Sequence, residues 1–116
     1  MTIFIKRIYE LPSTDDGYRV LVDRLWPRGV KKQDARIDEW LKDVAPSTEL
    51  RKWFNHEPEK WKAFTKKYAE ELRASSAYKS LQSLIEQQET VTLVYAARDE
   101  HFNQAAALQQ ILLTGR

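Results

Sequence analysis

Two runs of apolar residues without polar interruption constrain this chain more than any other feature of its sequence. They lie in "YRVLVDRLW", residues 18–26, and in "TVTLVYAA", residues 90–97. A strand with one face in water alternates apolar and polar side chains, whereas a strand covered on both faces is apolar throughout. Both segments are therefore predicted to be central, parallel strands that lie side by side.

A further strand is predicted at the N-terminus, where "TIFIKRIY", residues 2–9, is β-branched and aromatic and stops at Pro12. Turn residues follow in "PSTDDG", residues 12–17. This short connection leaves two alternatives open. It closes an antiparallel hairpin, or it bridges parallel strands by a short irregular crossover, and we adopt the parallel arrangement.

Between the second and third strands the apolar residues recur every three to four positions, which is the spacing of one helix face. A first helix is expected to end before Pro46, with the stripe Ile37, Trp40, Leu41 and Val44. Ser47 is expected to cap a short helix that carries Leu50, Trp53 and Phe54. Pro58 suits the first position of a longer helix with the stripe Trp61, Phe64, Tyr68 and Leu72.

Two more helices complete the prediction. Ser75 or Ser76 is expected to cap the fourth, whose inward side chains are Tyr78, Leu81, Leu84 and Ile85. Asp99 is expected to cap the last, which ends at Gly115 and buries Phe102, Ala105, Ala106 and Leu112. The fold class is thus α/β: a single small domain over residues 1–116, with a three-stranded, mostly parallel sheet, about five helices and a helical insertion between strands two and three.

Composition excludes several classes of protein. The 116 residues include no cysteine, which rules out disulfides, a thiolate nucleophile and cysteine-ligated metals. No segment approaches the ~20 apolar residues of a membrane helix, so we expect a cytoplasmic protein. Nucleotide-binding glycine motifs and a His-Glu-x-x-His zinc motif are both absent, and we expect neither a cofactor nor a metal.

Local charge suggests a binding site. Between residues 18 and 36 six cations stand against two acids, an excess of four in a chain whose formal charge is +2. Strand two runs into Asp23, Arg24 and Arg28, and strand three into Asp99 and Asn103. Because ligands of parallel sheets gather beyond the carboxyl ends of the strands, the two groups are expected to meet around an anion.

Structural roles are the alternative for the same residues. Asp23 and Arg24 are equally suited to a salt bridge with each other, and Asp99 to capping alone. Trp26 is expected to pack, Lys31 and Lys32 to be solvated, and the histidines to be exposed or to line the cleft. The aromatic stripe is expected to be core; it comprises Trp40, Trp53, Phe54, Trp61, Phe64 and Tyr68.

Four blocks of the sequence resemble a known family. They are "DGYRVLVDRLWPRGVKK", "WLKDVAPSTELRKWF", "HEPEKWKAF" and "VTLVYAARDEHFNQAAAL". They look like successive blocks of the YeaO-like proteins, the short branch of the domain of unknown function 488 family. The resemblance implies a bacterial, cytoplasmic α/β protein with a small parallel sheet. Longer relatives carry cysteines around their last strand, and this chain has none, so thiol chemistry does not transfer.

The polar residues of those blocks form the predicted site. Catalytic candidates are Asp23, His56 and Asp99, and the ligand-binding candidates are Arg24, Arg28, Arg51 and Asn103. The first hypothesis is binding of a phosphate or carboxylate, with or without catalysis. The second is a nucleic-acid module that uses Trp26 for stacking and Arg28, Lys31, Lys32 and Arg36 for phosphate contacts. The third is a structural or interaction protein without a ligand; the oligomeric state is left open.

Overall fold

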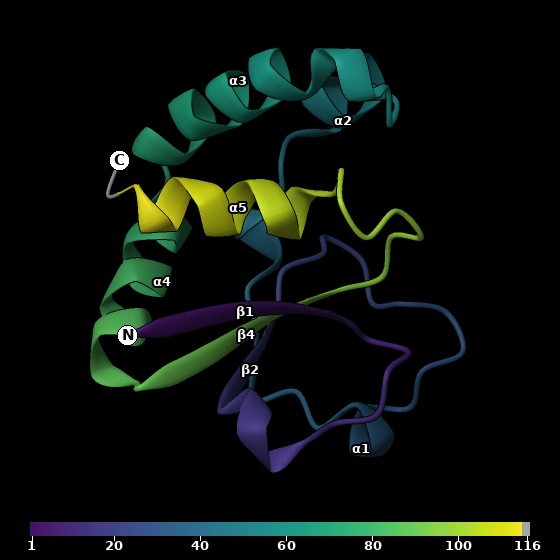
Figure 1. The fold of residues 1–116 in the computed structure, drawn as a ribbon, viewed down its shortest axis with the longest axis vertical. Helices are drawn as coiled ribbons and strands as arrows, with labels where there is room; N and C mark the ends of the chain where they lie inside the picture. The colour runs from purple at the N-terminus through teal and green to yellow at the C-terminus, as the bar shows by residue number, and fades with distance from the viewer. Residues whose placement is uncertain (115–116) are drawn as a thin grey trace.

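The computed structural model describes residues 1–114, and its centre is a parallel sheet of four strands in the order β1-β4-β2-β3 (Figure 1). The strands are β1 (Thr2–Arg7), β2 (Tyr18–Leu21), β3 (Glu39–Trp40) and β4 (Thr90–Tyr95). The helices are α1 (Lys32–Ala35), α2 (Thr48–Phe54), α3 (Trp61–Arg73), α4 (Ser76–Gln87) and α5 (Gln104–Leu113). Short 3₁₀ turns are η1 (Thr14–Asp16), η2 (Lys42–Val44) and η3 (Pro58–Lys60).

The two apolar runs are indeed neighbours, because β2 pairs with β4 in parallel, with Val20 opposite Leu93. The strand β1 also runs parallel to β4, on its other side, with Ile5 opposite Leu93. The predicted α/β class and parallel arrangement are therefore confirmed. The first connection bridges parallel strands that flank β4 rather than touch each other, and it folds through η1.

The prediction of three strands is wrong, because part of the expected first helix is a fourth strand. Instead of helical bonds, the backbone N–H groups of Asp38 and Leu41 donate to Arg19 and Leu21 of β2, at 2.9 and 3.0 Å. The apolar residues of this segment also divide between two places: Ile37 and Trp40 join one core cluster, while Leu41 and Val44 join the other. Their helical spacing therefore reflects a chain that passes the sheet edge. The insertion between β2 and β4 contains this strand as well as helices.

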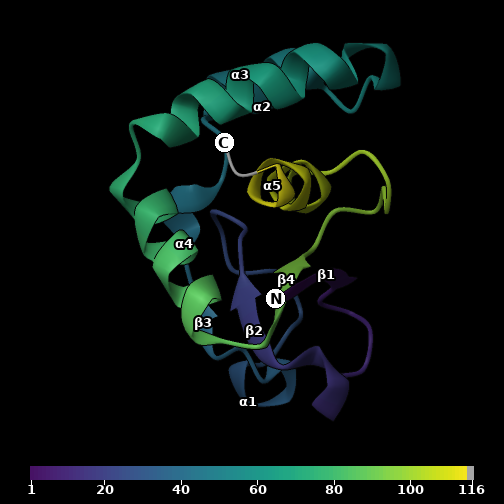
Figure 2. The ribbon, with the colours of Figure 1, turned by 60° about the vertical axis from the view of Figure 1, so that its left-hand side comes forward.

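Helices cover the two sheet faces unequally. Figure 2 looks along α5 and shows it between the sheet and α3, with α4 beside the sheet and only α1 on the opposite side. The larger core cluster lies under these helices and includes Val20, Leu93, Phe64 and Leu108. The smaller cluster, Ile8, Leu21, Ala35 and Val94, lies on the α1 side. None of the helices formed by residues 1–114 is long and apolar enough to cross a membrane.

Most helix starts follow the predicted caps. The side chains of Ser47 and Ser75 accept hydrogen bonds from the third residues of α2 and α4, and Pro58 opens the turn that leads into α3. Asp99 is not the cap of α5, whose N-cap is Asn103. The buried residues of α5 are Ala105, Ala107, Leu108 and Ile111, whereas Phe102, Ala106 and Leu112 are half-buried. The predicted stop at Gly115 lies outside the described residues.

Five members of the predicted aromatic stripe are buried or half-buried, as expected of core residues. The exception is Trp53, which is 39% exposed. Its ring faces outward from α2 and is flanked by the ammonium groups of Lys60 and Lys67, 5.0 and 5.2 Å from the ring centroid. The exposed tryptophan is thus covered by cations and by their aliphatic stems rather than by the core.

Candidate anion-binding site

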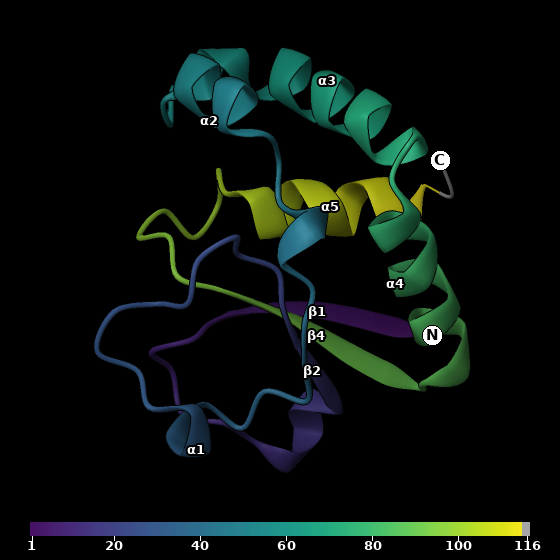
Figure 3. The same cartoon turned by 180° about the vertical axis from the view of Figure 1, so that it is seen from behind.

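A cavity of about 270 Å³ opens where the loops after β2 and β4 meet α2 and the start of α5. Figure 3 shows both loops leaving the sheet on the same side, below α2. This is the carboxyl end of the parallel strands, where ligand sites of such sheets occur. Its polar lining residues are Asp23, Arg24, Arg51, His56, Asn103 and Gln104.

The Asp23 carboxylate joins the ends of β2, β4 and α5. One oxygen accepts from the backbone N–H of Ala96 at 3.0 Å, and the other accepts from the side-chain amide of Gln104. Burial raises the pKa of Asp23 to about 6, although these two bonds and the charge of Arg51 act in the opposite direction. Asp23 is therefore mostly ionised at pH 7 and gains a proton under mildly acidic conditions.

Arg24 forms no salt bridge with Asp23 in the described structure. Its Nη2 instead donates to the carbonyl oxygens of Ala45 and Pro46, at 3.2 and 3.4 Å, which anchors the guanidinium against the segment before α2. Its Nε is buried and has no hydrogen-bond partner among the described residues. A buried donor without an acceptor costs about 1–3 kcal/mol, so this guanidinium retains an unused capacity for an oxygen atom.

Two further basic side chains face the cavity from the second helix and the turn after it. Arg51 lies on the exposed surface of α2, one turn after the Ser47 cap. After α2 the chain takes two successive left-handed conformations, with φ of 48° at Asn55 and 54° at His56. This tight turn brings His56 to the cavity, with its ring 6.1 Å from that of Phe54.

Asn103 is buried, and its hydrogen bonds are structural ones. Its side-chain oxygen Oδ1 accepts from the backbone N–H of Ala106, and its side-chain nitrogen Nδ2 donates to the Asp99 carbonyl, both at 2.8 Å. The neighbouring Gln104, which binds Asp23, is a lining residue that sequence reasoning missed. An uncharged amide in the first turn of a helix gives no distinctive signal, so only its partner reveals its place.

Two predicted site residues lie away from the cavity. The carboxylate of Asp99 accepts from the backbone N–H groups of His101 and Phe102, both at 2.9 Å, and these bonds lower its pKa. Asp99 thus shapes the loop before α5, and it does not line the cavity. Arg28 is exposed and also absent from the lining; its carbonyl accepts from the Tyr9 hydroxyl at 3.3 Å.

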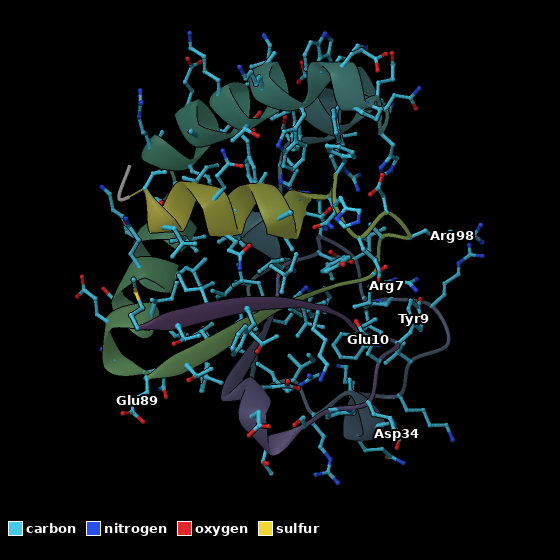
Figure 4. The ribbon with its side chains drawn as sticks, in the orientation of Figure 1. Arg7, Tyr9, Glu10, Asp34, Glu89 and Arg98 are labelled. Carbon is cyan, nitrogen blue, oxygen red and sulfur yellow. The ribbon has the colours of Figure 1, made fainter. Side chains whose placement is uncertain are left out.

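Nearby residues hold the carboxyl end of the sheet together. Figure 4 shows Arg7, the last residue of β1, near Tyr9 and Glu10, with Arg98 projecting away from the fold. The Arg7 Nε donates to the Ala97 carbonyl at 2.9 Å, and its guanidinium carbon lies 5.1 Å from the Tyr9 ring centroid. Trp26 packs edge-on against Trp40, with centroids 5.6 Å apart, and its indole N–H donates to the Val30 carbonyl.

Fold and site together define a small α/β protein with a basic cavity at the carboxyl ends of parallel strands. The family model described as the inactive DUF488-N3 subclade matches residues 2–115, and the chain belongs to this family. It is 48% identical over 112 residues to the uncharacterised protein Rv3073c of Mycobacterium tuberculosis, covering 97% of this chain and 93% of that one. It is 43% identical over 108 residues to the uncharacterised protein YeaO of Escherichia coli, covering 93% and 94%. No solved structure matches the chain.

Proposed function

We propose that this protein binds a small anion, a carboxylate or a phosphate, in the cavity beyond β2 and β4. The observation that carries the proposal is that Arg24 and Arg51, from different segments, line one cavity in which neither is in a salt bridge with the single acid present. Arginine in a partly enclosed site offers a fork of donors that matches the oxygens of such anions. One anion would occupy both.

Binding rather than turnover is the function that the observations favour. The matching subclade is described as inactive, and the chain has no cysteine to act as a nucleophile. The acid of the cavity, Asp23, accepts one hydrogen bond at each oxygen, from Ala96 and Gln104, and these bonds hold its carboxylate in place.

Thermal denaturation with acetate and with inorganic phosphate tests the proposal, each against sodium chloride at equal ionic strength. We expect at least one anion to raise the midpoint of the wild type, because a ligand that binds only the folded state stabilises it. Arg51→Gln should abolish the shift. Lys52→Gln is the matched control, since Lys52 is exposed on the same helix but does not line the cavity. If neither anion stabilises the wild type beyond chloride, the proposal fails.

The nucleic-acid hypothesis has a separate test. Trp26, its proposed stacking residue, has one ring edge against Trp40 and the Lys32 ammonium 5.7 Å from its ring centroid. A single-stranded oligonucleotide titrated at two salt concentrations would show binding that weakens steeply with salt if exposed cations contact phosphates. We expect no binding that depends on Trp26, and a loss of affinity in Trp26→Phe would favour this alternative over the cavity.

A further inference from the structure

The walls of the cavity carry more chemical information than its charges alone. Besides the arginines, the lining includes three phenylalanines, Phe54, Phe64 and Phe102, together with Leu25 and Pro46. Phe54 and Phe64 stack with centroids 4.2 Å apart, and Phe102 meets Trp61 edge-on at 5.4 Å. The rings are held by one another, so they form a preformed apolar wall. A phosphate or acetate ion would leave this wall in contact with water.

An exposed leucine continues the wall to the outside. Leu25 lies next to Arg24 in the loop after β2, lines the same cavity and is 75% exposed. A single exposed leucine is ordinary on a protein surface. At the rim of a cavity that already holds three phenylalanine rings, it extends the apolar surface that a ligand would cover. The apolar and the basic parts of the lining thus meet at the adjacent residues Arg24 and Leu25.

The charges set the charge of the ligand. With Asp23 ionised, Arg24 and Arg51 give the cavity a net charge of +1, which a ligand with one negative charge neutralises. A phosphate dianion would bring its second charge into a cavity with a carboxylate already held by Ala96 and Gln104. Like charges in a partly desolvated site repel, so the arrangement favours a monoanion.

The size of the cavity limits the ligand as well. About 270 Å³ lies just below the range of roughly 300–1,000 Å³ that is typical of ligand pockets. We propose that the ligand is a small monocarboxylate with a flat, apolar body of the size of benzoate. Its carboxylate lies at Arg24 and Arg51, and its body lies against Phe102 and Phe54. This inference rests on the proposed function.

Titration calorimetry at pH 7.5 and low ionic strength tests it with four probes: benzoate, its neutral isostere benzamide, acetate, and phenyl phosphate, which is largely a dianion at this pH. We expect benzoate to bind at least tenfold more tightly than each of the others. Phe102→Ala should reduce benzoate affinity about tenfold and leave acetate unchanged, because burial of a ring contributes only where there is a ring to bury. Arg51→Gln should weaken both carboxylates.

Phe4→Ala is the matched control: it also removes a half-exposed phenylalanine, from the edge strand β1 and outside the cavity lining. Phe102→Leu keeps an apolar side chain and guards against a loss caused by unfolding. If acetate binds as tightly as benzoate, anion binding stands and the apolar body is refuted. Tighter binding of phenyl phosphate refutes the monoanion. Binding of benzamide as tight as that of benzoate, or of no anion at all, refutes the proposed function itself.

Discussion

Two aspartates of this small fold lie near basic side chains, but only one of them forms salt bridges. Asp16, in the crossover before β2, is buried and paired with Lys6 at 3.0 Å and Arg19 at 2.6 Å. Asp23, at the end of the same strand, shares a cavity with Arg24 and Arg51 without a salt bridge to either within the described residues. In the closed cluster of Asp16, Lys6 and Arg19, the charges are paired with one another. In the open cluster of Asp23, Arg24 and Arg51, the Arg24 Nε has no hydrogen-bond partner among the described residues.

Their pKa shifts express this difference. Burial would raise the pKa of Asp16, but hydrogen bonds from the Ser13 backbone, Lys6 and Arg19 lower it overall. For Asp23 burial is the largest influence and prevails, raising the pKa to about 6. The ionised form is thus favoured by folding in one cluster and disfavoured in the other. A carboxyl group with a raised pKa in a cavity is a common feature of functional sites.

The largest effect should come from neutralising the closed cluster. We expect Asp16→Asn to lower the free energy of unfolding by about 4 kcal/mol in urea denaturation at pH 7, because Arg19 is left buried without a counter-charge. Glu57→Gln breaks the exposed salt bridge to Lys60 and serves as the control, for which we expect no measurable change. A loss in Asp16→Asn no larger than in the control would show that the buried pair is not stabilising.

The pH response of this cluster has a definite sign. The folded-state pKa of Asp16 lies below its unfolded value of 3.8, so its contribution is complete above pH 4 and is lost as pH falls through the lower folded value. Below pH 4 the free energy of unfolding should therefore fall more steeply with decreasing pH in the wild type than in Asp16→Asn.

The second effect compares two glycines with positive φ, one directly after Asp16 and one in the loop that follows Asp23. Gly17 follows Asp16 with φ +65°, and an added Cβ would lie 2.3 Å from the carbonyl oxygen of Thr90. Gly29 follows Arg28 with φ +73°, and an added Cβ would meet nothing within 4 Å. We expect Gly17→Ala to cost about 3 kcal/mol of unfolding free energy, and Gly29→Ala about 1 kcal/mol from backbone strain alone. Equal losses would mean that the contact with β4 is relieved at no cost.

The third effect concerns the open cluster and has the opposite sign. We expect Asp23→Asn to raise the free energy of unfolding by about 2 kcal/mol at pH 8, since it removes a carboxylate that burial disfavours. Because the folded pKa, about 6, exceeds the unfolded value, the wild type gains stability as pH falls from 7 towards 4. The difference between variant and wild type should therefore vanish near pH 4. A variant less stable than the wild type at pH 8 would make Asp23 a structural residue.

The sequence predicts the frame of this molecule better than its site. Continuous apolar runs located β2 and β4, since strand burial on both faces leaves a local signature, and serine caps located α2 and α4. The two-residue strand β3 has no such signature, because Trp40 and its neighbours match a helical period while bonding to β2. Asp99 and Asn103 are both suitable caps, and only the bond from the Ala106 backbone N–H to the side-chain oxygen of Asn103 identifies Asn103 as the N-cap.

The site residues divide by how far they lie from the strand ends. Asp23 and Arg24 come two and three residues after the end of β2, so their place at the cavity is set by the direction of the strand. Arg28 lies four residues further on, beyond Pro27, and the loop carries it to the surface. The local charge excess therefore predicted a basic region but not which of its arginines line the cavity. The direction of the loop depends on contacts such as that between the Tyr9 hydroxyl and the Arg28 carbonyl.

The smallest effect joins the pH response of Asp23 to the cavity. Protonation of Asp23 removes one negative charge from the cavity that Arg24 and Arg51 also line. The same charge acts on the buried Tyr68 hydroxyl of α3. We expect benzoate affinity, measured by calorimetry, to rise about fivefold between pH 8 and pH 5.5, because one charge in a partly solvated site is worth on the order of 1 kcal/mol. The carboxyl of benzoate stays ionised over this range. Asp23→Asn should bind benzoate with the higher affinity at both pH values.

His56 also lines the cavity, so its contribution to the pH response is separated from that of Asp23. The calorimetric measurement is therefore repeated with His56→Gln, which removes the imidazole from the lining. If the rise survives in His56→Gln and is lost in Asp23→Asn, the carboxylate controls the cavity charge. If it is lost in His56→Gln alone, the histidine controls it, and the contrast between a closed Asp16 and a responsive Asp23 concerns stability only.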